Sequence, residues 1–179
     1  MKRHAIVVLV MMCALLALFA IVQAAGIDVL IDPRPAFAGL GALAAVAAVG
    51  LLIADVLLPV PSSLVMVWLG ASQGWLAGAA LSLVGCVGAT VFAFWLGRRG
   101  GPLFERLVPR DERARADAFL ARWGVLAIAV TRPVPIIAET TAVVAGASPA
   151  VRWRGMLIAA IAGCAPWAVI YGLSGAALV

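Results

Sequence analysis

Charged residues are scarce in this sequence. Asp, Glu, Lys and Arg make up 12% of its 179 residues, and hydrophobic residues make up 65%, whereas a soluble domain carries about 25% charged residues. This composition excludes an ordinary soluble domain and indicates an integral membrane protein. The apolar runs are long and rich in Ala, Leu, Val and Gly, so we expect an all-α protein in which every spanning element is a helix.

Residues that bind metals or perform acid–base chemistry are also few. The only histidine is His4, and the three cysteines, Cys13, Cys86 and Cys164, lie inside apolar runs at spacings that match no metal motif. We therefore expect no metal and no cofactor, and we expect the cysteines to be small buried side chains. Because the sequence has no cluster of His, Ser and Asp, we do not expect an enzyme such as an intramembrane lipid phosphatase.

The apolar runs predict a single membrane domain over residues 1–179. About 20 apolar residues are needed to span a bilayer, and runs divided by proline or charge fall short of that length. The predicted segments are a first transmembrane helix (1–26), a re-entrant hairpin (36–74), a transmembrane helix (75–97), a cytoplasmic interfacial helix (98–122), a second re-entrant hairpin (123–148) and a last transmembrane helix (155–178). A cleaved signal peptide is an alternative for the first segment, because Val22, Gln23 and Ala24 form an acceptable cleavage site.

Each predicted hairpin is an apolar run broken by charge and proline. The residues at the breaks are Asp55, Pro59 and Pro61 in the first hairpin, and Arg132, Pro133, Pro135 and Glu139 in the second. Proline removes a backbone donor and interrupts a helix, so the apolar pieces on either side are too short to cross alone. Two full spans would also return the chain to its starting side, and they stay an alternative to each hairpin.

The basic residues predict the orientation of these segments. In the predicted arrangement, one side of the membrane carries nearly all of them: Lys2, Arg3, the arginines of residues 98–122, Arg152 and Arg154. Only Arg34 falls on the other side. Cytoplasmic loops are enriched in Lys and Arg, so we expect a multi-pass membrane protein with a cytoplasmic amino terminus. The net charge of +5 then reflects membrane orientation, and we expect no nucleic-acid partner.

Two tripeptides occur twice. Pro-Val-Pro begins at Pro59 and Pro133, and Gly-Ala-Ser begins at Gly70 and Gly146, with eight residues between them in the first copy and ten in the second. The prolines and these two glycines are assigned a structural role at the hairpin tips. The first hairpin would enter from outside and the second from the cytoplasm, so together they would form an inverted repeat, as in secondary transporters. Chance coincidence in a chain rich in Ala, Val and Pro is the alternative.

Three charges inside apolar segments form the candidate site: Asp55, Arg132 and Glu139. An unpaired charge at membrane depth costs roughly 2.5–3.5 kcal/mol on insertion scales, so these side chains should meet one another, a cavity or a ligand. The planar guanidinium of Arg132 suits a phosphate group. We expect Arg132 to recognise an anionic, phosphate-bearing lipid headgroup, while Asp55 and Glu139 carry protons or gate access. An ion pair that only locks the hairpins together is the alternative.

Three ordered stretches between residues 36 and 148 carry a family resemblance. They are Asp55-Val-Leu-Leu-Pro-Val-Pro-Ser-Ser63, Phe94-Trp-Leu-Gly-Arg-Arg-Gly100, and Arg122-Trp-Gly124 with Thr131-Arg-Pro-Val-Pro135 and Ala145-Gly146. The first stretch is similar to the acidic residue, proline pair and serine of a known family. The second is similar to that family's Tyr/Phe-x-x-Gly-Arg-x-x-Gly helix end, and the third to its Arg-x-x-Pro…Ala-Gly hairpin. As a set they resemble the DedA-like, VTT-domain (SNARE-associated) superfamily of membrane proteins.

The resemblance implies two facing re-entrant hairpins and a role in moving lipids. In that superfamily the role is translocation of undecaprenyl phosphate or phospholipid, proton-coupled in bacteria, and scrambling in eukaryotic relatives. It implies that Asp55 is the essential acidic residue and Arg132 the first hairpin arginine. The chain departs from the pattern at Ser63, Ala138 and Thr90, where many members have an acidic residue, a second arginine and another acidic residue.

Two functions therefore stand side by side. The leading hypothesis is a transporter-like protein that translocates a polyprenyl phosphate or a phospholipid across the inner membrane, with proton coupling. The alternative is a structural or assembly factor of the membrane that transports nothing. Membrane lipids are the expected partners, and an oligomer is compatible with the sequence.

Overall fold

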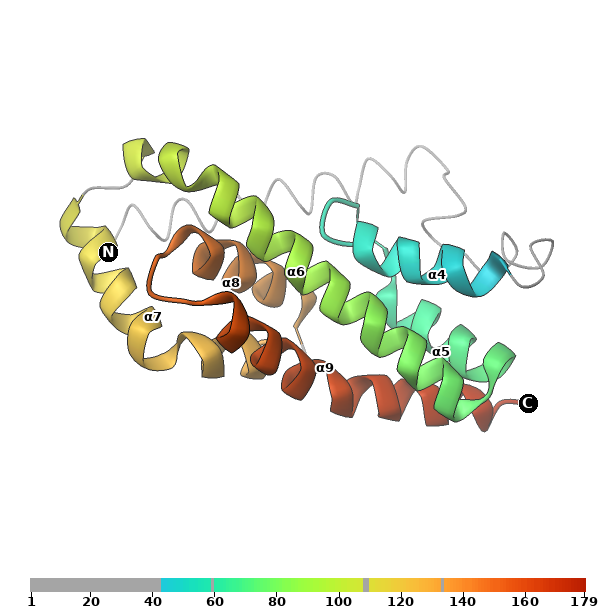
Figure 1. Cartoon of the computed structure of the whole chain (residues 1–179). Coiled ribbons are helices and arrows are strands. Elements are labelled where there is room, and N and C mark those ends of the chain that lie inside the picture. Colours follow the sequence, from blue (N-terminus) through green and yellow to red (C-terminus); the bar gives the residue numbers. More distant parts are fainter. Residues whose placement is uncertain (1–42, 59, 108–109, 133) are drawn as a thin grey trace.

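The computed structural model describes residues 43–58, 60–107, 110–132 and 134–179. Within these ranges the protein is all-helical, with no strand, and six helices follow one another (Figure 1): α4 Leu43–Ala54, α5 Ser62–Gln73, α6 Trp75–Leu107, α7 Arg110–Val130, α8 Pro135–Ala147 and α9 Trp153–Ala176. The predicted first transmembrane helix, the start of the first hairpin, Pro59 and Pro133 lie outside the described residues.

The long helices α6 and α9 form the centre of the bundle. They pack against each other, α6 also contacts α4, α5 and α8, and α9 also contacts α5 and α7. The segments Trp75–Gly100 and Trp153–Ala176 are long and apolar enough to cross a membrane. Large apolar side chains such as Val84 and Ile158 are more than half exposed on these helices, and hydrocarbon rather than water suits such surfaces.

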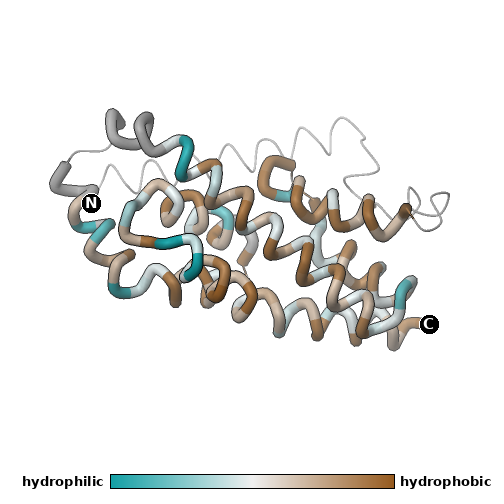
Figure 2. Tube along the Cα trace, viewed as in Figure 1, coloured by the Kyte–Doolittle hydropathy of each residue, from teal (hydrophilic) through white to brown (hydrophobic). Residues whose placement is uncertain are grey.

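Hydrophilic residues gather at one end of the bundle. Figure 2 shows them on α7 and along the connection between α8 and α9, while hydrophobic residues cover most of α4, α5 and the middle of α6 and α9. Arg98 on α6 belongs to this end because it donates hydrogen bonds to the carbonyls of Ser148 and Val151, at 3.0 and 2.7 Å. The hydrophilic end is therefore tied to the apolar bundle by direct contacts.

The predicted breaks at Asp55 and Arg132 are interruptions between helices. α4 ends at Ala54, and the Asp55 carboxylate accepts a hydrogen bond of 3.1 Å from the backbone N–H of Val60, which closes the turn before α5. α8 begins at Pro135, a first-turn position where the missing N–H of proline has no helical partner to lose. The turn from α5 to α6 contains Gly74 with φ +79°, a conformation that favours glycine.

The contact between α5 and α9 depends on glycine. A Cβ at Gly70 would lie 2.3 Å from the carbonyl oxygen of Gly172, and a Cβ at Gly175 would lie 2.0 Å from the carbonyl oxygen of Val67. No side chain fits at these distances, so the two backbones touch directly, as small residues allow in membrane helices. Gly70 thus lies in the body of α5, and not in the turn between α4 and α5.

The contact between α8 and α6 has the same form. A Cβ at Gly146 would lie 2.1 Å from the carbonyl oxygen of Phe94, and a Cβ at Gly97 would lie 1.9 Å from the carbonyl oxygen of Val143. Gly146 therefore lies near the end of α8 and again contacts a long helix, away from the turn that precedes α8.

Two helix boundaries differ from the prediction. The glycines and proline of residues 97–102 were expected to end a helix, yet α6 continues to Leu107. α7 passes through residue 123 without a break, because Gly124 is buried against Leu120 and Val151, where a polar segment meets an apolar one. In both places tertiary packing overrides local helix propensity, which is a weak predictor. The last helix, α9, contains Pro166 in its interior.

Candidate functional site

A pocket of about 260 Å³ lies where the two breaks meet the long helices. All three predicted site residues, Asp55, Arg132 and Glu139, line it. The other lining residues come from α4, α5, α6, α8 and α9: Leu52, Ser62, Ser63, Met66, Cys86, Ala89, Ala138, Cys164, Trp167 and Tyr171. Asp55 and Arg132, which are 77 residues apart in the sequence, thus line one cavity.

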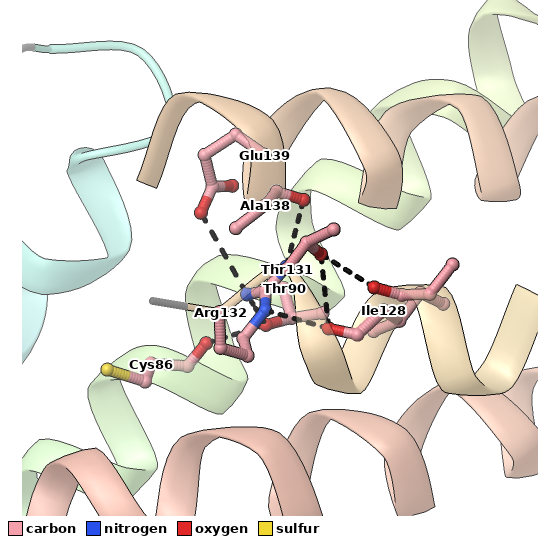
Figure 3. Close-up of polar contacts among 8 residues, drawn as sticks. Cys86, Thr90, Ile128, Thr131, Arg132, Ala138 and Glu139 are labelled. Atoms are coloured by element: carbon pink, nitrogen blue, oxygen red, sulfur yellow. Dashed lines mark hydrogen bonds and ion pairs between the residues drawn. The ribbon is translucent and has the colours of Figure 1, made fainter. Parts of the chain in front are cut away.

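Arg132 is held rigidly at this pocket. Its side chain is 6% exposed. Its Nε donates to the carbonyl of Ile128 at 3.2 Å, one Nη donates to the Thr90 hydroxyl at 2.7 Å, and the other donates to the carbonyl of Ala138 at 2.9 Å (Figure 3). These bonds reach α6, α7 and α8, so the guanidinium joins three helices.

The hydrogen bonds of Arg132 leave part of its guanidinium available. A guanidinium has five N–H donors, and three of them serve the contacts with Ile128, Thr90 and Ala138. The remaining donors belong to the two Nη atoms, which are the pair that binds a carboxylate or phosphate in bidentate fashion. The site therefore combines a fixed cation with donors for an anion.

Glu139 is the nearest acidic partner, but it does not hydrogen-bond Arg132. Its Oε1 lies 4.0 Å from an Nη of Arg132, a separation that is an ion pair and too long for a hydrogen bond. Its Oε2 is buried and has no hydrogen-bond partner among the described residues. Leaving a buried polar group unpaired costs about 1–3 kcal/mol, which marks Glu139 as a group with unused binding capacity.

Asp55 faces the same pocket from the turn that follows α4. One carboxylate oxygen accepts the Val60 N–H described above, and Ser62 and Ser63, the first two residues of α5, line the pocket beside it. The carboxylate is thus fixed by backbone on one side and open to the cavity on the other. The two breaks contribute opposite charges to one space.

The sequence analysis named Thr90 only as a departure from the family pattern and did not predict its contact with Arg132, although a signal for it exists. Thr90 is fully buried, donates to the carbonyl of Cys86 at 2.8 Å and accepts the bond from Arg132. Ser82, Cys86 and Thr90 follow one another at intervals of four on α6, which places them on one face of a helix. A stripe of small polar residues on an apolar helix marks a buried face, from which Cys86 lines the pocket and Thr90 bonds Arg132.

A second polar cluster holds the helices at the hydrophilic end. Besides the bonds from Arg98, the Ser148 hydroxyl donates to the carboxylate of Asp117 on α7 and accepts the backbone N–H of Ala150 at 3.2 Å. The Arg98 guanidinium also lies 5.0 Å from the centre of the Phe94 ring. This cluster fixes α6 and α7 to the connection that precedes α9, and it lies outside the residues that line the pocket.

Comparison with known proteins agrees with the family expected from the sequence. The family model of the VTT domain matches residues 60–177, a range that includes Arg132, Glu139 and helices α5 to α9. No curated protein matches the chain, and no solved structure does. Because the family match covers more than half of the chain, this protein belongs to the VTT-domain family and is a membrane protein of the DedA type.

Proposed function

We propose that this protein translocates an anionic, phosphate-bearing lipid across the membrane. The observation that carries the proposal is the convergence of Asp55, Arg132 and Glu139 on one pocket. Charges within apolar segments are costly and mark functional sites by default. The fixed cation can bind a phosphate, and the two carboxylates beside it can favour its release. In a membrane, lipid headgroups are the most abundant source of phosphate groups.

In the proposed mechanism the Nη donors of Arg132 bind the headgroup phosphate. Glu139, 4.0 Å away, competes with the phosphate for the same guanidinium, and protonation of Glu139 would release Arg132 to bind. Asp55, on the opposite break, would exchange protons as the headgroup passes. The acyl or prenyl chains would stay in the hydrocarbon beside the apolar outer surfaces of α6 and α9. A polyprenyl phosphate and a phospholipid share this chemistry.

We also infer that α4–α6 and α7–α9 are two copies of one unit in inverted orientation. Corresponding helices of the two units make corresponding contacts. The contact of α4 with α6 matches that of α7 with α9, the contact of α5 with α9 matches that of α8 with α6, and the contact of α4 with α5 matches that of α7 with α8. Asp55 and Arg132 occupy the corresponding breaks. In such repeats the binding site lies where the two units meet, which is where this pocket lies. The breaks are then the tips of two re-entrant hairpins.

We propose the bacterial inner membrane as the location, with a cytoplasmic amino terminus. Arg98 of α6 bonds to the hydrophilic end of the bundle, and the hydrophilic stretches of α7 and of the connection between α8 and α9 carry further arginines, such as Arg115, Arg122 and Arg152. An excess of Lys and Arg faces the cytoplasm, so this end would be the cytoplasmic one.

A purely structural role is the second candidate, and the bonding of Arg132 favours it. Its three bonds to α6, α7 and α8 would stabilise the fold whether or not anything is transported. On that hypothesis the protein is a membrane assembly factor, and charge-conserving changes at the pocket have no effect on lipid movement.

A lipid-flipping assay separates these candidates. Vesicles containing the purified protein and a fluorescent anionic phospholipid are treated with a membrane-impermeant quencher, and the rate of quenching of inner-leaflet lipid is measured. We expect Arg132→Lys and Asp55→Asn to slow flipping about tenfold or more, since a bidentate site is not matched by lysine. Arg99→Lys, exposed and outside the pocket, is the matched control. If folded Arg132→Lys and Asp55→Asn proteins flip lipid at the wild-type rate, the transport proposal is wrong.

A further inference from the structure

The pocket contains three sulfur-bearing side chains that have no role in the proposed lipid translocation. Cys86 on α6 and Cys164 on α9 both line it, and Met66 on α5 brings a thioether to the same cavity. Both cysteines are free thiols. The two thiols reach this cavity from the two long helices, which pack against each other. A pair of thiols from separate helices is a different arrangement from an isolated buried cysteine.

The geometry points to a binding site for one monovalent soft metal ion, with Cys86 and Cys164 as ligands and Met66 as a supporting third sulfur. Thiolate and thioether sulfur select soft ions such as Cu(I). Among the described residues no group of three His, Cys, Asp or Glu side chains is placed to hold a metal. That finding argues against zinc, which takes four such ligands, but a soft monovalent ion needs fewer.

The positive charge of Arg132 favours a monovalent ion over a divalent one. Binding replaces the two thiol protons with the metal, so two protons leave and no electron is transferred. A monovalent ion with two thiolates carries a net charge of −1, whereas a divalent ion with the same ligands is neutral. Arg132 lies beside both cysteines, and its positive charge complements the first complex and gains nothing from the second. Asp55 and Glu139 line the same pocket, and an ionised carboxylate there would repel the anionic complex, so binding favours the protonated form of these two groups.

The proposal does not depend on lipid translocation and is tested by metal binding alone. Silver(I) serves as the probe because it has the charge and softness of Cu(I) and is not oxidised in air. The full-length protein in detergent is reduced, freed of reductant, mixed with one equivalent of silver nitrate and passed through a desalting column with excess free methionine. Silver and protein in the eluate are then quantified by elemental analysis.

We expect about one silver ion per chain to be retained by the wild type. Cys86→Ala and Cys164→Ala should each lower retention about tenfold, because one thiol cannot compete with free methionine in excess. The matched control is Cys13→Ala, which removes the third cysteine and should leave retention unchanged. Met66→Leu conserves volume and should lower retention by a smaller factor. It also keeps the test informative if a cysteine variant does not fold.

Three results would overturn the proposal. The first is retention that persists in both Cys86→Ala and Cys164→Ala, and the second is retention that disappears in Cys13→Ala. The third is a count of fewer than two free thiols in Cys13→Ala protein purified without reductant, because Cys86 and Cys164 would then form a disulfide and not a metal site. Circular dichroism and elution volume establish that each variant is folded before its silver content is compared with that of the wild type.

Discussion

The hydroxyl of Thr90 positions Arg132, and its removal gives the sharpest test of the site. Thr90→Val keeps the shape of the side chain but removes the acceptor of the 2.7 Å bond from Arg132. Thr90 is fully buried and the Arg132 side chain is 6% exposed, so water cannot replace the lost partner. An unsatisfied buried donor costs about 1–3 kcal/mol, and more when it is charged.

This cost can be measured as a change in melting temperature. For a chain of this size, 1 kcal/mol corresponds to about 2–4 °C, so we expect the melting temperature of Thr90→Val in detergent to fall by about 2–12 °C. Lipid flipping should fall with it, and Thr90→Ser should restore both. Thr131→Val is the matched control, because the Thr131 hydroxyl also donates to a carbonyl four residues earlier, at 2.7 Å, but makes no hydrogen bond with the Arg132 side chain. Equal losses in the two valine variants, or no loss in Thr90→Val, would refute the positioning role.

Two further pairs of variants test the packing that shapes the pocket, each by melting temperature in detergent. Gly97→Ala should destabilise the protein by about 1–3 kcal/mol, because its Cβ would meet the backbone of Val143. Gly100→Ala has no neighbour within 4 Å and should stabilise the helix by about 0.5–1 kcal/mol. A gain in both variants would show helix propensity without the packing restraint and would contradict the close contact at Gly97. Arg98→Met removes two charge-assisted bonds, each worth about 1.5–3 kcal/mol, while Arg99→Met removes only a stacking contact with Trp95 and should change stability by less than about 1 kcal/mol. Similar effects of the two arginine changes would contradict the role given to Arg98.

The sequence was sufficient to identify the class of fold and the main residues of the site. Charge inside an apolar run is rare and costly, so Asp55, Arg132 and Glu139 stand out without any structure. Proline beside those charges marks the ends of the helices for an equally local reason. The family resemblance rested on the same residues, and the VTT-domain match confirms it.

The partners of these residues could not be predicted, because they depend on how helices pack. Thr90, Cys86 and Cys164 are small residues of a kind common in apolar helices. Only the packing of α6 against α9 brings Cys86 and Cys164 to one cavity, and only the fold brings the Thr90 hydroxyl to Arg132. The predicted end of the helix near Gly100 was wrong for a related reason, since α6 continues to Leu107. Local propensity favours a stop at two glycines and a proline, and the packing of Gly97 against Val143 of α8 is not visible in the local sequence.

The direct backbone contact between α5 and α9 has a consequence for how the protein is made. Gly70 is synthesised about 100 residues before Gly172, the residue on α9 that it touches. α8, in contrast, meets α6 after α6 has already been inserted. During synthesis the side of α5 that meets Gly172 must therefore wait for its partner until α9 leaves the ribosome. A chain truncated within α9 would expose that face permanently, and membrane quality-control proteases should degrade such a chain faster than the full-length protein.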